Sequence, residues 1–277
     1  MMALGHREVA GVVGHDVGAA VAAYCALVRP DYFRSLVLMS PFGGVPPLPF
    51  GPAEKLPEQP SLAQQLTALH PPRKDSYSYF ATPSANHDMW QAKQGLSDFL
   101  RAYFFLKSAD NPAHPPQPLA SAAATELAKL PTYYIMDLQE TMATTVAPLM
   151  PTEAQVAHMH WLSVSDLAVY VREYTRTGFQ GALNWYRCLI DGTHRAELEL
   201  FAGRTIDIPA CFIAGEADWA LYRQPGALEA MQTTACTQMG APHLIPGAGH
   251  WVQQEKPKET SEHLLAFLER ARASGAK

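Results

Sequence analysis

Three polar residues of this sequence, Asp16, Asp218 and His250, have the types and surroundings needed for nucleophilic catalysis. A carboxylate can attack an electrophilic carbon and form an ester, and a histidine oriented by a second carboxylate can activate water to hydrolyse that ester. Each residue alone has an ordinary explanation as a turn or helix-capping residue. Their chain order of nucleophile, acid and histidine favours the catalytic interpretation.

Asp16 lies at the centre of the pentapeptide Gly14-His15-Asp16-Val17-Gly18. Glycine two positions on either side of the centre permits a tight turn, because it tolerates unusual backbone angles and has no side chain to clash. A turn of this kind between a strand and a helix directs the central side chain toward substrate and places the next N–H near a developing oxyanion. The motif predicts that Asp16 is the nucleophile and that the Val17 N–H is an oxyanion donor.

A strand-helix-strand unit is needed to position Asp16. Residues 8–13 form a short apolar run, residues 18–28 are rich in alanine and leucine, and residues 35–40 form a second apolar run. The two runs predict buried parallel strands, and the alanine-rich segment between them predicts a helix. Together they form a βαβ unit with Asp16 at the end of its first strand.

The segment after residue 204 returns to the same alternation. We predict strands and helices there, in turn, at residues 208–214, 226–234, 242–245 and 258–272. Asp218 follows the first of these strands, and His250 follows the second in a glycine-rich loop. Because catalytic groups of parallel sheets gather beyond the carboxyl ends of strands, we expect both residues to lie near Asp16.

Residues 42–204 separate the two parts and show a different pattern. The segment begins with a proline-rich stretch, contains no convincing parallel strand, and has helix-like patterns at residues 61–69, 98–106, 152–161 and 166–175. We interpret it as an inserted, mostly helical lid. The predicted organisation is an α/β core made of residues 1–41 and 205–277, with the lid at 42–204.

Three core motifs resemble the soluble epoxide hydrolase branch of the α/β-hydrolase superfamily: the pentapeptide around Asp16, Gly215-Glu216-Ala217-Asp218-Trp219 and Gly247-Ala248-Gly249-His250-Trp251. In the insertion, Thr177-Gly178-Phe179-Gln180-Gly181-Ala182-Leu183-Asn184-Trp185-Tyr186-Arg187 resembles the family's lid segment that ends in Asn-Trp-Tyr-Arg. The resemblance spans nearly the whole chain. It implies an α/β-hydrolase fold and a cofactor-independent opening of an epoxide to a vicinal diol through an aspartyl ester.

The resemblance also implies a role for two tyrosines of the lid. Tyr186 matches one of two acids that hold the epoxide oxygen in this family, whereas its residue type alone indicates an aromatic packing residue. The second family tyrosine falls on Ser76 in an ungapped match. Tyr77 is the neighbouring residue, and Tyr79 lies two residues further. Of these two tyrosines, we take Tyr77 as the candidate for the second role.

The sequence departs from the family before the elbow. Family members place about half of the sheet and a His-Gly-x-Pro oxyanion loop ahead of the nucleophile, but here the elbow begins at residue 14 and no His-Gly-x-Pro occurs. We therefore expect a sheet truncated on its N-terminal side, with about four strands and the elbow strand as an apolar edge. Loss of one oxyanion donor commonly lowers a rate on the order of a hundredfold. A fragment, a misplaced start and a degenerate protein all fit this departure.

Two alternative functions follow from the same residues. A haloalkane or haloacid-type dehalogenase would use the same aspartate chemistry, although haloalkane-type members usually carry tryptophan after the nucleophile, where Val17 stands here. A truncated, catalytically inactive remnant is the second alternative.

The composition limits the classes of partner that this protein is expected to bind. The formal net charge of −5 over 277 residues provides no basic footprint for nucleic acid or an anionic membrane. No apolar run approaches the roughly 20 residues of a membrane helix. Four dispersed cysteines indicate neither a disulfide framework nor a zinc site. We predict a cytoplasmic protein with no metal or cofactor that acts on a small apolar or aromatic epoxide and water, and we leave a homo-oligomer open.

Overall fold

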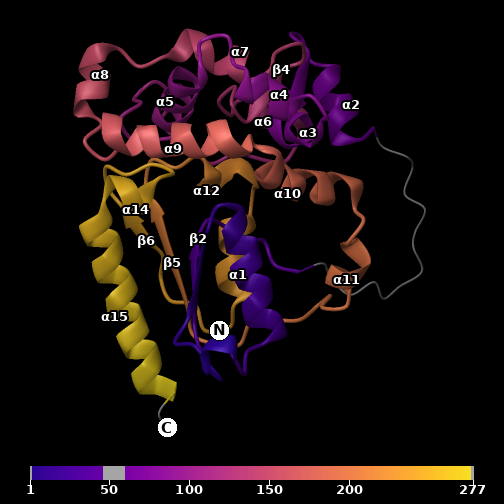
Figure 1. The fold of residues 1–277 in the computed structure, drawn as a ribbon. Helices are drawn as coiled ribbons and strands as arrows, with labels where there is room; N and C mark the ends of the chain where they lie inside the picture. Colours follow the sequence, from indigo (N-terminus) through magenta and orange to yellow (C-terminus); the bar gives the residue numbers. More distant parts are fainter. Residues whose placement is uncertain (1, 46–59, 276–277) are drawn as a thin grey trace. The chain divides into compact units, whose positions relative to one another are not determined.

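The computed structural model describes residues 2–45 and 60–275, and these residues form two compact units. The first unit contains the described residues up to 45 together with residues 116–118 and 196–275, and the second contains residues 60–115 and 119–195. Figure 1 follows the chain through both units by colour. Residues 46–59, which belong to the predicted insertion and include part of its proline-rich start, lie outside the described residues.

A four-stranded sheet forms the centre of the first unit (Figure 1). Its strands, in spatial order, are β1 (Val12–His15), β2 (Leu36–Met39), β5 (Ala210–Gly215) and β6 (His243–Ile245). Every neighbouring pair is parallel, with Leu38 in register with Gly14 on one side and with Phe212 on the other. The sheet confirms the predicted parallel α/β class, and β1 is an end strand of this order.

Helices cover both faces of the sheet. Alternate side chains of β2 and β5, including Leu38 and Phe212, pack with the alanine-rich face of α1 (Val17–Val28). The intervening side chains, including Val37 and Ile213, pack with α15 (Pro257–Gly275). The unit also contains η1 (Met2–Leu4), most of α11 (Arg195–Glu199), α12 (Ala220–Arg223), α13 (Ala227–Ala230), the π-helical turn η3 (Met231–Ala235) and α14 (Val252–Glu255).

Short helices dominate the second unit. Its elements are α2 (Leu62–Thr67), β3 (Arg73–Asp75), α3 (Ser76–Ala81), α4 (Ala85–Trp90), α5 (Leu96–Leu106), α6 (Ala124–Leu127), β4 (Ile135–Asp137), α7 (Met142–Val146), η2 (Ala147–Leu149), α8 (Glu153–His158), α9 (Val164–Thr177) and α10 (Gln180–Asp191). The four helices predicted for the insertion correspond to α2, α5, α8 and α9. The structure adds an antiparallel pairing of β3 with β4. That this unit acts as a lid stays a prediction.

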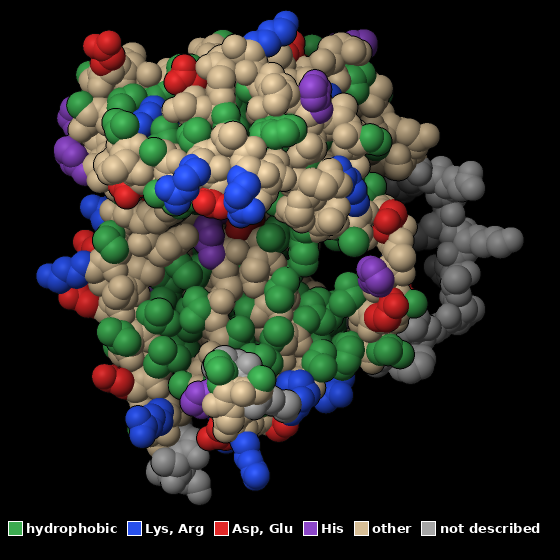
Figure 2. Space-filling model, viewed as in Figure 1, with side chains coloured by type: hydrophobic (Ala, Val, Ile, Leu, Met, Phe, Trp, Pro, Cys, Tyr) green, Lys and Arg blue, Asp and Glu red, His purple; other side chains and the backbone are tan. Residues whose placement is uncertain are grey.

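Apolar side chains remain exposed on the first unit. Val13 of β1 and Val21 and Val28 of α1 keep between 45% and 48% of their surface exposed. Figure 2 shows hydrophobic side chains gathered on the face of this unit that carries α1. Within the described part of the chain, no helix is both long and apolar enough to span a membrane.

Candidate active site

The turn between β1 and α1 has the geometry that the pentapeptide predicts. Asp16 adopts φ 52° and ψ −126°, and it is the sole non-glycine residue with positive φ among the described residues. Such backbone angles are strained for a side chain larger than glycine's and are often found at functional sites. A Cβ on Gly14 would lie 2.1 Å from the carbonyl oxygen of Gly18, so only glycine fits there. The tight elbow is therefore confirmed.

Ser40, at the end of the neighbouring strand β2, fixes the elbow from the side. The backbone N–H of Asp16 donates to Ser40 Oγ at 3.1 Å, and the Ser40 hydroxyl donates to the Met39 carbonyl at 2.7 Å. Val17 begins α1, so its N–H has no acceptor within the helix, as an oxyanion donor requires. Sequence reasoning missed Ser40, although a serine directly after a buried strand was an available signal.

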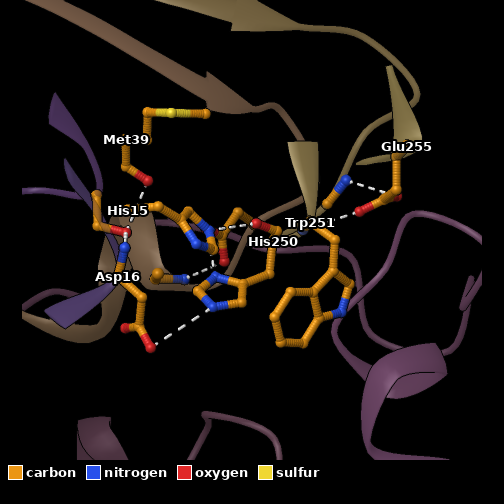
Figure 3. Close-up of polar contacts among 10 residues, drawn as sticks. His15, Asp16, Met39, His250, Trp251 and Glu255 are labelled. Atoms are coloured by element: carbon orange, nitrogen blue, oxygen red, sulfur yellow. Dashed lines mark hydrogen bonds and ion pairs between the residues drawn. The ribbon is translucent and has the colours of Figure 1, made fainter. Parts of the chain in front are cut away.

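His250 lies at the same end of the sheet as Asp16 (Figure 3), and Asp218 contacts His250 there. His250 Nδ1 lies 3.0 Å from Asp218 Oδ2, and both side chains are buried. Because a carboxylate accepts, the proton of neutral His250 belongs on Nδ1, which leaves the lone pair on Nε2. His250 Nε2 lies 3.9 Å from Asp16 Oδ2 and has no hydrogen-bond partner among the described residues. The structure thus brings the three predicted residues together.

A close approach of two loops makes this meeting possible. A Cβ on Gly215, the last residue of β5, would lie 2.2 Å from the carbonyl oxygen of Gly249. The Ala217 N–H donates to the Ala248 carbonyl at 2.9 Å. The loop after β5 therefore contacts the loop after β6, and the glycine in the first motif is needed for that contact. The second carboxylate oxygen of Asp218 accepts from the Ala220 N–H at 2.8 Å, which fixes its orientation.

Two further side chains contact the backbone around His250 (Figure 3). His15 Nε2 donates to the His250 carbonyl at 2.7 Å, so the proton of its neutral ring is on Nε2. Burial, and after it the nearby His250 ring, lower the pKa of His15 to about 4. The carboxylate of Glu255 accepts from the N–H groups of Gly249 and Trp251 at 2.9 and 3.0 Å. Neither role was predicted, because both contacts are set by the fold.

Within the second unit, Tyr186 on α10 and Tyr77 on α3 lie side by side. Their ring centroids are 4.9 Å apart, and Phe80 contacts Tyr186 at the same separation. Ser76, the position that an ungapped match gives to the second tyrosine, is buried, and its N–H donates to the Tyr134 carbonyl. The structure therefore pairs Tyr186 with Tyr77. A shared action of these tyrosines and Asp16 on one substrate stays a prediction.

No group of three histidine, cysteine or acidic side chains suited to a metal ion occurs among the described residues. The four cysteines are all free. The expectation of a reaction without metal or cofactor stays a prediction, and it rests on the residues of the triad.

The chain belongs to the alpha/beta hydrolase fold family, whose pattern matches residues 1–257. Epoxide hydrolase A of Mycobacterium tuberculosis is 43% identical over 111 residues, which cover 39% of this chain and 32% of that protein. Epoxide hydrolase B of the same organism is 29% identical over 276 residues, covering 94% of this chain and 72% of that protein. These matches confirm the predicted resemblance to epoxide hydrolases.

Comparison of this chain with solved structures identifies the same fold. The epoxide hydrolase from an endophytic Streptomyces has a TM-score of 0.68 at 26% identity, covering 98% of this chain and 71% of that chain. Potato epoxide hydrolase I has a TM-score of 0.61 at 24% identity, covering 97% and 72%. The α/β-hydrolase fold is thereby confirmed, whereas the expected truncation of the sheet stays a prediction.

Proposed function

We propose that this protein is a hydrolase that opens an epoxide to a vicinal diol through an ester on Asp16. The observation that carries the proposal is the triad geometry, in which a strained aspartate faces the Nε2 of a histidine whose other ring nitrogen is bonded to Asp218. Its relatives' names, epoxide hydrolase A and epoxide hydrolase B, support the substrate class. An aspartate at the elbow favours attack on an alkyl carbon, whereas serine there would favour an acyl carbon.

In the first step, a carboxylate oxygen of Asp16 attacks an epoxide carbon and the ring C–O bond breaks. The released oxygen takes a proton from a phenol, for which we propose Tyr186 assisted by Tyr77. The products of this step are a hydroxyalkyl ester on Asp16 and a phenolate. No metal or cofactor is needed, because the carboxylate and the phenol supply the nucleophile and the acid.

In the second step, His250 Nε2 takes a proton from water, and the water oxygen attacks the ester carbonyl carbon. Asp218 stabilises the imidazolium, and the Val17 N–H donates to the oxyanion of the tetrahedral intermediate. Collapse of this intermediate breaks the acyl C–O bond, and the leaving alkoxide takes the proton of the added hydroxyl, which gives the diol and restores the Asp16 carboxylate. The proton held by His250 returns to the phenolate, so that the sum of both steps is epoxide plus water to diol.

Oxygen-isotope labelling in a single turnover tests the ester directly. With excess protein and styrene oxide as the probe in ¹⁸O-water, the first diol should contain no label, because its new oxygen comes from Asp16. The label should appear in the Asp16 carboxylate by peptide mass spectrometry. A labelled diol in the first turnover would instead mean direct attack of water and would overturn the nucleophile assignment.

Two substitutions separate the two steps. Asp16→Ala should abolish diol formation, whereas His250→Asn should leave ester formation and block its hydrolysis, so that the intact protein gains the mass of the epoxide. His6→Asn, at an exposed position of the same unit, is the matched control and should behave like the parent. Halide release from chlorinated alkanes, with no diol from any epoxide, would favour the dehalogenase alternative. Absence of both reactions from a folded chain would favour the inactive remnant.

The tyrosine proposal has its own test. Tyr186→Phe should slow ester formation by about a hundredfold, the lower end of what general acids contribute. Tyr77→Phe should have a smaller effect, and the double variant should be slower than either. Tyr103→Phe, in the same unit, serves as the matched control. Equal ester-formation rates for the parent and the double variant would remove both phenols from the mechanism. The preference for small apolar or aromatic epoxides and the cytoplasmic location stay predictions.

A further inference from the structure

The loop that carries His250 is held from both sides of its backbone (Figure 3). On one side, the two carboxylate oxygens of Glu255 accept from the N–H groups of Gly249 and Trp251, the residues that flank His250. On the other side, the His250 carbonyl accepts from His15. All three hydrogen bonds are between 2.7 and 3.0 Å long. The backbone of residues 249–251 therefore has little freedom to rotate.

Glu255 is well suited to this role because of its place in the chain. It is the last residue of α14, one helical turn after Trp251, and its own N–H donates to the Trp251 carbonyl at 2.8 Å. The carboxylate thus folds back over the start of its own helix. It binds the N–H of Trp251, the N-cap residue, which the helix cannot satisfy internally, and the N–H of Gly249 just before it. Hydrogen bonds to an ionised acceptor are about twice as strong as neutral ones.

The imidazole of His250 depends on this backbone for its position. Its Nδ1 must stay within hydrogen-bond distance of Asp218, while its Nε2 must face the Asp16 carboxylate. A misplacement of about 1 Å can lower a catalytic rate by about a hundredfold. Small rotations around Gly249 would produce such a shift, because glycine has no side chain to restrict them.

We propose that Glu255 is a positioning residue that holds His250 in place for the second, water-activating step of the reaction. This inference rests on the proposed function. Glu255 touches neither the substrate nor the reacting atoms in this scheme. Its removal should therefore change the hydrolysis of the Asp16 ester and leave the attack of Asp16 on the epoxide nearly unchanged.

The test compares the two steps in Glu255→Ala and Glu255→Gln. Rapid-quench mixing with styrene oxide and intact-mass analysis would give the rates of ester formation and ester loss separately. For Glu255→Ala, we expect ester formation within about twofold of the parent and ester loss slower by tenfold to a hundredfold. Glu255→Gln should lie between the two, because its amide keeps one acceptor oxygen and turns an NH₂ group toward the other N–H.

Glu259→Ala is the matched control, since it removes the same charge from an exposed position four residues away. It should leave both rates unchanged. A loss of folded protein would lower the amount of ester formed without slowing its decay, so a purely structural role would not slow ester loss selectively. Equal slowing of both steps, or no change in either, would overturn the inference.

A measurement independent of turnover separates this inference from the proposed function. The Nδ1 proton of His250, held by Asp218, should give a protected downfield NMR signal in the parent. Asp218→Asn should remove this signal, Glu255→Ala should broaden or remove it, and Glu259→Ala should preserve it. If the parent forms no ester or diol, the proposed function fails, while the NMR comparison still decides whether Glu255 positions His250. An unchanged signal in Glu255→Ala would reject that role.

Discussion

At the scale of single residues, His15 makes a hydrogen bond that supports the His250 loop, and its pKa is lowered in the folded protein. Its Nε2 donates to the backbone of His250, and burial lowers its pKa to about 4 from an ordinary value of 6.5. The fold therefore prefers the neutral ring. Between pH 6.5 and 4 the unfolded chain binds a proton at this residue that the folded chain does not, so stability decreases as the pH falls through this range.

Replacing His15 with glutamine should weaken this pH dependence. Glutamine keeps an N–H donor at a similar reach and does not titrate. We expect the free energy of unfolding of the parent to fall more steeply between pH 6.5 and 4, by up to about 1.4 kcal/mol per pH unit, than that of His15→Gln. Urea unfolding at several pH values measures this difference. Parallel curves for the two proteins would show that His15 is protonated equally in both states.

The residues of the candidate site differ in how far sequence could predict them. Asp16, Asp218 and His250 were predictable because each follows an apolar run and each has a side chain suited to a step of one reaction. Ser40 offered only its place directly after a buried strand as a signal, and His15 and Glu255 offered none, because the roles of all three are hydrogen bonds to backbone atoms. Such bonds depend on the exact approach of one loop to another, which residue types alone do not encode.

At the scale of elements, the cysteines differ in burial according to the element that carries them. Cys211 on β5 and Cys236 after η3 are buried, and burial raises the pKa of each thiol to about 11. Cys188 on α10 is exposed. The thiolate is the reactive form of cysteine. The two buried thiols are therefore protected from reagents in two ways: reagents cannot reach them, and their raised pKa keeps them protonated.

Thiol labelling of the native protein should follow this order. With iodoacetamide at pH 7.5, we expect Cys188 to react first, and Cys211 and Cys236 to react only when urea unfolds the protein. Peptide mass spectrometry identifies the labelled residue, and Cys188→Ser is the matched control that should remove the fast phase. Fast labelling of Cys211 in the native state would contradict the buried position of β5.

Elements with a strong apolar pattern were the ones that sequence predicted. The strands β1, β2, β5 and β6 and the helices α1 and α15 all lie within or close to their predicted ranges. The strands β3 and β4 have three residues each, and α3, α4 and α7 have at most six, so little of a period can appear in them. The six-residue helices α2 and α8 were predicted because they lie within longer helix-like stretches of the sequence. Capping was the available signal for one of them, because Thr141 and Thr144 form a capping box at the start of α7.

At the scale of the whole molecule, the first unit has an apolar face that is partly exposed. Val21 and Val28 on α1 lie next to an end strand that has paired on one side only among the described residues. Exposed apolar patches and open strand edges promote association between chains. The net charge of −5 adds only a weak repulsion against it.

Substituting both valines with lysine should therefore improve solution behaviour without changing the fold. We expect Val21→Lys and Val28→Lys to change stability by less than about 0.5 kcal/mol each, as surface substitutions usually do. The protein concentration at which light scattering begins should rise. Val169→Lys, on an exposed position of the second unit, is the comparison. Equal scattering of all variants would show that this face does not drive association.

The order of the strands along the sequence also affects when Asp16, Asp218 and His250 can come together during folding. The elbow lies between β1 and α1, and β1 pairs with β2, the next strand in the sequence. In contrast, β2 pairs with β5, and the second unit lies between these two strands in the sequence. Closing such a long loop adds little free energy per doubling of length, about 0.6 kcal/mol, yet non-local pairing slows folding. We therefore expect a refolding chain to form the turn at Asp16 before His250 reaches it. Under the proposed function, the recovery of ester hydrolysis would then report when the two halves of the sheet join.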